Sequence, residues 1–201
     1  MDGAYNLMTE KKRCNWVTND PLYIAYHDSE WGEPIHRDKQ LFECLILETF
    51  QSGLSWITIL RKRENFREAL DFFDSTKMAQ YKENKIEELL LNSGIVRHKQ
   101  KIRAAISNAQ AFIKIQEEFG SFNSFIWAFV KRKPIQNKRK QMSEITATSD
   151  LSDKLSKELK KRGFKFVGSK VIYAFMQATG MVNDHTIDCF RYAELKNNES
   201  D

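Results

Sequence analysis

The chain has 201 residues, of which 41% are hydrophobic, and its formal net charge is +5. This composition excludes an intrinsically disordered chain and suffices for one large domain or two small lobes around a core. Only 3 prolines and 8 glycines interrupt a sequence rich in Leu, Ile, Lys and Glu, which favours helices over a turn-rich β fold. The positive charge favours a phosphate-rich partner without proving one.

The sequence gives no sign of a membrane segment. No apolar run is long enough to cross a bilayer, and residues 1–12 lack the apolar centre of a signal peptide. We therefore expect a cytoplasmic protein without a membrane partner, with residues 1–12 as a loose N-terminal extension. The odd cysteine count, Cys14, Cys44 and Cys189, argues against a disulfide framework and leaves metal binding or simple burial open.

Helical patterns begin after residue 37. Asp38 is the expected N-cap of a helix that ends before Gly53 and carries a broad apolar face of Leu41, Phe42, Cys44, Leu45 and Leu47. A short helix is expected after Ser55, with Trp56, Ile59 and Leu60 turned inward. Asp74 then opens a further turn.

The second half of the chain continues the helical pattern. Asn84 with Glu87 predicts a capping box, and Gly120 predicts the end of the longest helix. Helices are expected over residues 98–118, 125–130, 149–162 and 169–179. Residues 131–148 are basic and poor in apolar side chains, which favours a solvated loop over a dedicated phosphate clamp.

Strand signals are nearly absent, so the predicted fold class is all-α. We expect a compact helical bundle, in one or two lobes, with residues 13–192 as a single domain and residues 193–201 as a loose tail.

Two cysteines and two histidines near the chain ends form a candidate metal set: Cys14, His27, His185 and Cys189. The H-x3-C spacing of the second pair would place both side chains on one side of a helical turn. A Cys2His2 set is the complement of a closed structural zinc site. Spacing alone favours the alternative of two buried cysteines and two ordinary histidines, because C-x12-H is a weak signature.

Glu48 stands among aromatic residues and is the candidate catalytic group. It follows Leu45 by three and Cys44 by four, so its carboxylate lies on the apolar face of its helix, where an unpaired charge is costly. The surrounding rings, Trp16, Tyr23, Tyr26, Trp31 and Trp56, suit a pocket for a planar, electron-poor ring. For a lone glutamate, a salt bridge or a helix cap is the more common explanation.

A basic turn joins the last two long predicted helices, over residues 160–170, and has Gly163 and Gly168 within it. Backbone N–H groups at the start of the second helix, together with the flanking lysines, could hold a phosphate without reading base sequence. Many helix pairs have glycine turns, so this signal alone is weak.

Six motifs resemble one family, the constitutive bacterial 3-methyladenine DNA glycosylase I. They are Arg13–Trp16, Asp20–Tyr23, Tyr26–Gly32, Gly53–Leu60, Arg162–Gly168 and Val182–His185, and they occur in the family's order over almost the whole chain. The resemblance implies a helix-hairpin-helix glycosylase fold, with a structural zinc ion that joins the chain ends through Cys14, His27, His185 and Cys189.

The resemblance also implies roles for the pocket residues. Glu48 would be the pocket carboxylate, Tyr26 its hydrogen-bonding companion and Trp56 a stacking wall, while Trp16 and Trp31 would line the same cavity. The implied activity is a monofunctional glycosylase of base-excision repair. It would act as a monomer on double-stranded alkylated DNA, flip out 3-methyladenine and hydrolyse its N-glycosidic bond.

Several residues are implied DNA contacts: Leu54, Lys165, Gly168, Ser169 and Lys170. Leu54 is an apolar wedge or, equally, an ordinary buried leucine, and Gln51 and Ser52 beside it are alternative backbone contacts. Lys170 occupies the place of a Schiff-base lysine in strand-cutting relatives, although a lysine there is more commonly a phosphate contact. Asn183 occupies the place of the catalytic aspartate of many helix-hairpin-helix glycosylases, with Asp184 one position away.

Two other functions compete with this interpretation. A zinc-stabilised module could bind DNA damage without chemistry, although Glu48, Tyr26 and Trp56 are all present. A catalytic zinc hydrolase or deaminase is disfavoured, because four protein ligands leave no position for water and the H-x-E…P-C-x-x-C signature is missing.

Overall fold

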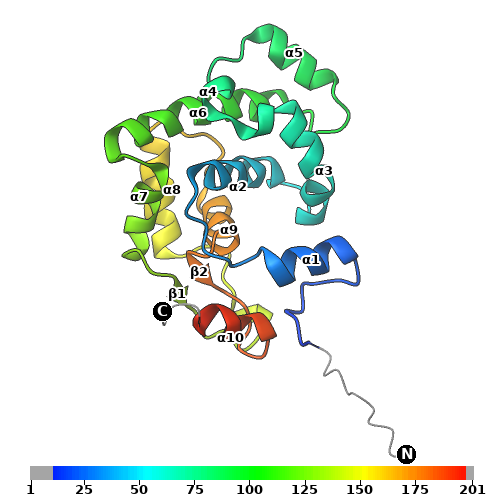
Figure 1. Cartoon of the computed structure of the whole chain (residues 1–201), viewed down its shortest axis with the longest axis vertical. Helices are drawn as coiled ribbons and strands as arrows, with labels where there is room; N and C mark the ends of the chain where they lie inside the picture. The colour runs from blue at the N-terminus through cyan, green and yellow to red at the C-terminus, as the bar shows by residue number, and fades with distance from the viewer. Residues whose placement is uncertain (1–10, 198–201) are drawn as a thin grey trace, which may run out of the picture.

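The computed structural model describes residues 11–197, which fold mainly into helices. The helices are α1 (Pro21–Ser29), α2 (Asp38–Gln51), α3 (Trp56–Ala69), α4 (Ser75–Met78), α5 (Glu83–Leu91), α6 (Lys99–Phe119), α7 (Phe122–Trp127), α8 (Asp150–Lys161), α9 (Ser169–Ala178) and α10 (Phe190–Asn197) (Figure 1). Short 3-10 turns are η1 (Asp71–Phe73), η2 (Ala128–Val130) and η3 (Met142–Glu144), and two-residue strands are β1 (Ile135–Gln136) and β2 (Val182–Asn183). The prediction of a mostly helical, compact fold is confirmed.

The central helix is α2, which contacts α3, α6, α7 and α9 (Figure 1). Its apolar face is fully buried, as the sequence pattern predicts, with Leu41, Phe42, Leu45, Ile46 and Phe50 at 0% exposure. Removal of this much apolar area from water is the main force that fixes the helices around it. The same burial draws Glu48, on that face, out of solvent.

Asp38 is the first residue of α2, and its predicted role as the N-cap of that helix is wrong. Arg37 holds the N-cap position and makes no side-chain cap. The Asp38 carboxylate instead accepts hydrogen bonds from the backbone N–H groups of Phe122 and Asn123, at 2.9 and 2.8 Å. It therefore caps α7, 84 residues away in sequence, because the unpaired N–H groups of a helix start can donate to any well-placed carboxylate.

Of the other predicted helix ends, some are confirmed and some are wrong. Asp74 caps α4, and Gly120 ends α6 at a φ of +79°, as predicted. The Asn84–Glu87 capping box is wrong, because α5 begins at Glu83 and the Asn84 side chain accepts only from the N–H of its neighbour Lys85. The helix after Ser55 is not short, since α3 has 14 residues.

The basic segment 131–148 is not a plain solvated loop. Its strand β1 pairs in parallel with β2, with Ile135 opposite Val182 and Gln136 opposite Asn183. This backbone pairing spans 47 residues of sequence and has no alternating apolar signature, so the sequence pattern did not reveal it. In the following turn, η3, Met142 packs against residues near the two ends of the chain, among them Cys14 and Cys189.

The apolar interior has a large and a small cluster. The large one surrounds α2, and the small one joins the two ends of the chain through Cys14, Tyr26, Trp31, Leu60, Ala178 and Cys189. Cys44 and Trp56 pack against both clusters. Consistent with this, α1 and α10 lie at the same end of the molecule in Figure 1.

Both ends of the described range are attached to the fold. The backbone carbonyl of Lys12 accepts a hydrogen bond from the N–H of Phe190, so Lys12 does not belong to a loose extension. Residues 193–197 continue α10, with Leu195 at 5% exposure, which corrects the expected loose tail in this part. The remainder of both expected tails, residues 1–10 and 198–201, lies outside the described residues. Between residues 11 and 197, no helix is long and apolar enough to cross a membrane.

Candidate functional site

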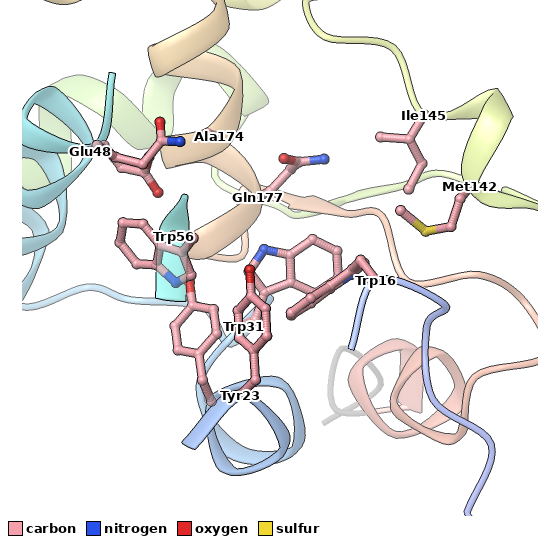
Figure 2. Close-up of a pocket in the computed structure, with 11 residues that line it drawn as sticks. Trp16, Tyr23, Trp31, Glu48, Trp56, Met142, Ile145, Ala174 and Gln177 are labelled. Atoms are coloured by element: carbon pink, nitrogen blue, oxygen red, sulfur yellow. The ribbon is translucent and has the colours of Figure 1, made fainter. Parts of the chain in front are cut away.

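A cavity of about 270 Å³ lies between α1, α2, α3 and α9 (Figure 2). Every aromatic residue predicted for a base-binding pocket lines it, together with Glu48. The lining residues are Trp16, Tyr23, Tyr26, Trp31, Glu48, Gln51, Trp56, Met142, Ile145, Ala174 and Gln177. Its size and largely aromatic walls suit one planar ring system of the size of a purine.

Glu48 is the carboxylate of this cavity. It is 4% exposed, and no described residue gives it a hydrogen bond or an ion pair. The alternatives of a salt bridge to lysine or a helix cap are therefore wrong for Glu48. Burial raises the pKa of Glu48 to about 8, so the carboxyl group is mostly protonated in the empty cavity at neutral pH. A cation placed beside it would favour the ionised form.

The rings around Glu48 support one another by edge contacts. The Trp16 ring lies 5.1 Å from the rings of both Tyr23 and Trp31, and the Tyr26 ring lies 5.6 Å from Trp56. Burial raises the pKa of Tyr26 well above its usual value, which keeps its hydroxyl protonated as a donor. The indole N–H groups of Trp16 and Trp56 are buried without a partner among the described residues, so this wall has two unused donors.

The far wall of the cavity contains residues that sequence reasoning missed. Ala174 and Gln177 are one helical turn apart on α9, and Met142 and Ile145 come from the segment around η3. The i, i+3 spacing of Ala174 and Gln177 is a usable signal for a shared face, but nothing in the sequence indicates what that face meets. Met142 and Ile145 carry no such signal, because their position depends on the β1–β2 pairing.

The four predicted metal ligands meet in one buried cluster, with all four donor atoms within 4.8 Å of one another. Cys14 Sγ lies 3.4 Å from His185 Nδ1, and Cys189 Sγ lies 3.4 Å from His27 Nε2 and 3.5 Å from His185 Nδ1. Tetrahedral coordination with ordinary bond lengths gives sulfur–nitrogen separations of roughly 3.5 Å. The cluster could therefore hold a four-coordinate metal ion.

The outer nitrogens of both histidines are also fixed. His27 Nδ1 lies 2.8 Å from Asp28 Oδ1, and Arg13 donates three hydrogen bonds to that carboxylate. His185 Nε2 lies 3.0 Å from the Trp31 carbonyl. Carboxylate and carbonyl partners of this kind orient metal-binding imidazoles, which turns the inner nitrogens toward the two thiols. Hydrogen bonds from Cys14, His185 and His27 lower the pKa of Cys189, which favours its thiolate form.

One detail of the predicted metal set is wrong. His185 and Cys189 do not lie on a helix, because α10 begins only at Phe190. They lie in a turn in which the Cys189 N–H donates to the Thr186 carbonyl. A non-helical turn can bring together two ligands four residues apart as well as one turn of a helix can.

The predicted DNA-contact residues lie on two turns. Leu54 follows Gly53, which has a φ of +87°, and is 38% exposed, so the alternative of an ordinary buried leucine is wrong. Gly168 and Ser169 are partly exposed at the start of α9, and the side chains of Lys165 and Lys170 are exposed nearby. The helix α6 supports both turns. Lys101 donates to the carbonyls of Phe50 and Ser52. The Asn108 side chain donates to the Lys165 carbonyl and accepts a hydrogen bond from the Lys165 N–H.

Asp184 is buried at 1% exposure and does not line the cavity. Its carboxylate accepts hydrogen bonds from Asn137, Tyr173 and Gln177, with Arg139 at 3.5 Å. Neighbouring Asn183 is buried and donates to Gln136. Neither side chain is available to a substrate in this arrangement.

Comparison with known proteins assigns the family. The model of the methyladenine glycosylase family matches residues 16–192. The chain belongs to this family. It is 50% identical to DNA-3-methyladenine glycosylase 1 of Escherichia coli over 181 residues, which covers 90% of this chain and 97% of the relative.

Solved structures of family members agree with this fold. A crystal structure of 3-methyladenine DNA glycosylase I has a TM-score of 0.87 and 50% identity, over 89% of this chain and 98% of the other. The Staphylococcus aureus 3-methyladenine DNA glycosylase I, solved to explain 3-methyladenine recognition, has a TM-score of 0.86 and 39% identity, over 89% of this chain and 95% of the other. The predicted family resemblance is thereby confirmed.

Proposed function

We propose that this protein is a DNA-3-methyladenine glycosylase, which releases 3-methyladenine from alkylated DNA by hydrolysis of the N-glycosidic bond in base-excision repair. The observation that carries this proposal is a buried carboxylate without a counter-charge, Glu48, inside an aromatic cavity large enough for one purine. Membership of the methyladenine glycosylase family supports the same activity.

The chemistry follows from the charge of the substrate. Adenine methylated at N3 in DNA carries a delocalised positive charge, so its glycosidic bond is already weak and the leaving base needs no protonation. Ionised Glu48 would stabilise the cationic base and accept a hydrogen bond from its exocyclic amine. The faces of Trp16 and Trp56 would favour the cation over neutral adenine through cation–π contact. The task of the site is therefore discrimination more than bond breaking.

The base must leave the duplex to reach this cavity. Leu54, exposed on its tight turn, is suited to fill the gap in the stack as an apolar wedge. We assign the turn between α8 and α9 to a helix-hairpin-helix element, whose backbone N–H groups and lysines would hold the DNA backbone. Lys170, exposed at the start of α9, is assigned to a phosphate contact, which makes the enzyme a monofunctional hydrolase. We expect it to act as a monomer.

Cys14, His27, His185 and Cys189 would hold a structural zinc ion. Two thiolates, two imidazoles and their fixed outer partners are the chemistry that zinc prefers in closed sites. The ion would supply a cross-link between the chain ends and, with four protein ligands, no position for a reacting water. This argues against the competing zinc hydrolase or deaminase.

Replacement of one carboxylate tests the activity. Glu48→Gln removes the charge and keeps the shape, so we expect release of 3-methyladenine from methylated DNA to fall about 100-fold, the usual cost of losing one strong electrostatic partner. Mass spectrometry of the released bases measures it. Glu43→Gln, on the same helix but paired with Arg67 outside the cavity, is the matched control and should retain wild-type release.

The outcome also separates the enzyme from a damage-binding module. Wild-type release by Glu48→Gln would contradict the role of the carboxylate. A wild-type protein that binds methylated DNA but frees no base would favour the non-catalytic module.

A further inference from the structure

Gln177 presents a polar group to the cavity that the proposed chemistry leaves unused. It lies on α9, one turn after Ala174, and both residues line the cavity. Figure 2 shows its amide beyond Trp16 and Trp31, with the oxygen on the side of Glu48 and the nitrogen on the other side. No other amide faces the cavity from α9 in the described chain.

The orientation of this amide is fixed by Asp184. Gln177 Nε2 lies 2.8 Å from Asp184 Oδ2. An ionised carboxylate only accepts hydrogen bonds, so the group that faces it must be the NH2 and the oxygen must lie on the opposite side. Exchange of the amide nitrogen and oxygen would place two acceptors in contact, which is strongly unfavourable.

Asp184 is itself held in place by donors. Tyr173 donates its hydroxyl to Asp184 Oδ2 at 2.7 Å, and Asn137 donates to Oδ1 at 2.8 Å. The Arg139 guanidinium lies 3.5 Å from Oδ1 and supplies a compensating positive charge. Burial, together with the hydrogen bond to Asp184, raises the pKa of Tyr173 to about 12, so the hydroxyl remains a donor over the working pH range. This buried carboxylate therefore has a positioning role and not a catalytic one, because it orients the Gln177 amide.

We infer that Gln177 is a specificity-determining residue, which offers Oε1 as a fixed neutral acceptor to the exocyclic amine of a flipped base and rejects a base with a carbonyl at that place. Asp184 is its positioning residue. This inference rests on the proposed function and names the substrate preference of the same cavity.

The two relevant bases share their ring shape and positive charge and differ in the polar groups along one edge. 3-Methyladenine and 3-methylguanine are both flat and both cationic in DNA, so charge and stacking alone do not separate them. The C6 amine of 3-methyladenine has two hydrogens, so Glu48 and Gln177 can each accept one. At C6 the first has an amine, which donates hydrogen bonds, and the second has a carbonyl, which accepts them. A fixed acceptor that faces a carbonyl leaves two buried acceptors without a hydrogen between them, and such mismatches are the most effective basis for discrimination.

The test compares release of the two bases from the same methylated DNA. Gln177→Met keeps the length of the side chain and removes the acceptor. We expect kcat/KM for 3-methyladenine to fall about tenfold and kcat/KM for 3-methylguanine to stay or rise, so the selectivity ratio falls at least tenfold. Gln116→Met is the matched control, because Gln116 also donates its amide to a carboxylate, Asp38, but lies outside the cavity. It should keep the wild-type ratio.

A second variant tests the positioning role. Asp184→Asn allows the Gln177 amide to adopt both orientations, so the selectivity ratio should fall while the bound metal, measured on the same sample, stays at the wild-type content. An unchanged ratio in Gln177→Met, or an equal loss of both bases, would overturn the inference. A wild-type protein that releases neither base would refute the proposed function itself, which is a separate result.

Discussion

Glu48 is buried among aromatic rings without a counter-charge, an arrangement that costs folding free energy whenever the carboxyl group ionises. Its place in the apolar face of α2 follows from the sequence, because positions 45 and 48 lie one helical turn apart. A cationic base would offset the cost, since it brings the missing positive charge into the cavity. The ionised Glu48 carboxylate is thus unfavourable in the empty protein and would be favourable in a complex with a cationic base.

The raised pKa of Glu48 predicts a pH dependence of catalysis. In the free enzyme the carboxyl group ionises only near pH 8, so kcat/KM for 3-methyladenine should rise with pH up to about 8. Once the cationic base is bound, ionisation is easier and kcat should level off at lower pH. Single-turnover release measured from pH 5 to 9 checks both profiles. A profile that is flat in this range, or a rise that persists in Glu48→Gln, would contradict the prediction.

The same pKa predicts the stability of the empty protein. Because the pKa of Glu48 is higher in the folded state than the usual 4.5, its protonated form stabilises the fold, and that stability is present below about pH 4.5 and lost as the pH rises through 8. At pH 9 the loss amounts to at most about 5 kcal/mol. Glu48→Gln should therefore be more stable than the wild type at pH 9 and close to it at pH 5. Urea unfolding at both pH values measures this, and equal free energies of unfolding at pH 9 would contradict it.

At the scale of elements, α6 connects the two turns assigned to DNA contact. Lys101, in its first turn, caps the carboxyl end of α2 through the carbonyls of Phe50 and Ser52, which fixes the turn that carries Leu54. Two turns further along, Asn108 fixes the backbone of Lys165 in the other turn. One helix therefore sets the spacing between the turn that carries Leu54 and the turn between α8 and α9.

The wedge role of Leu54 predicts a dependence on duplex structure. Leu54 is exposed, so Leu54→Ala should change the free energy of unfolding by less than about 0.5 kcal/mol. Release of 3-methyladenine from duplex DNA should nevertheless fall about tenfold, because the gap left by the base is no longer filled. Release from single-stranded DNA should stay unchanged, since no stack has to be opened.

Leu91→Ala provides the comparison for this experiment. Leu91 is 83% exposed at the end of α5 and belongs to neither turn, so the variant should match the wild type on both substrates. Equal losses of Leu54→Ala on duplex and single-stranded DNA would exclude a wedge.

At the scale of the whole molecule, the Cys/His cluster joins Cys14 and Cys189 across more than 150 residues. A cross-link that closes so long a loop removes much of the conformational entropy of the unfolded chain. The same cluster positions α1, which carries Tyr23 and Tyr26, against the rest of the cavity. Loss of a metal ion bound by this cluster would therefore loosen one wall of the site as well as the fold.

Removal of the metal should lower the melting temperature by roughly 10 °C, from a cross-link worth about 4 kcal/mol in a chain of this size. Calorimetry with and without a chelator, followed by zinc addition, measures the loss and its recovery. Cys14→Ala should contain no zinc and show no response to the chelator. Cys44→Ala is the matched cysteine control, because Cys44 lies outside the cluster. This variant should keep both its zinc and its response to the chelator. Wild-type protein that contains no metal after zinc addition would contradict the assignment.

The amino-acid pattern is enough to predict the helical class, most helix positions and the residues that could carry chemistry. These features depend on local spacing: the apolar period of α2 places Glu48 in the interior, and Asp74, Ser149 and Gly120 define helix ends through contacts within a few residues. The Cys/His set could be listed from sequence, although its H-x3-C pair was expected on a helix and lies in a turn.

The contacts of those residues depend on how distant parts of the chain pack together. Asp38 caps a helix 84 residues away, and Met142 reaches the cavity because β1 pairs with β2. Gln177 acquires a fixed orientation from Asp184, which follows the turn after α9 and strand β2. Such contacts are set by the packing of distant segments, and no local period encodes which polar group will face another across a buried interface.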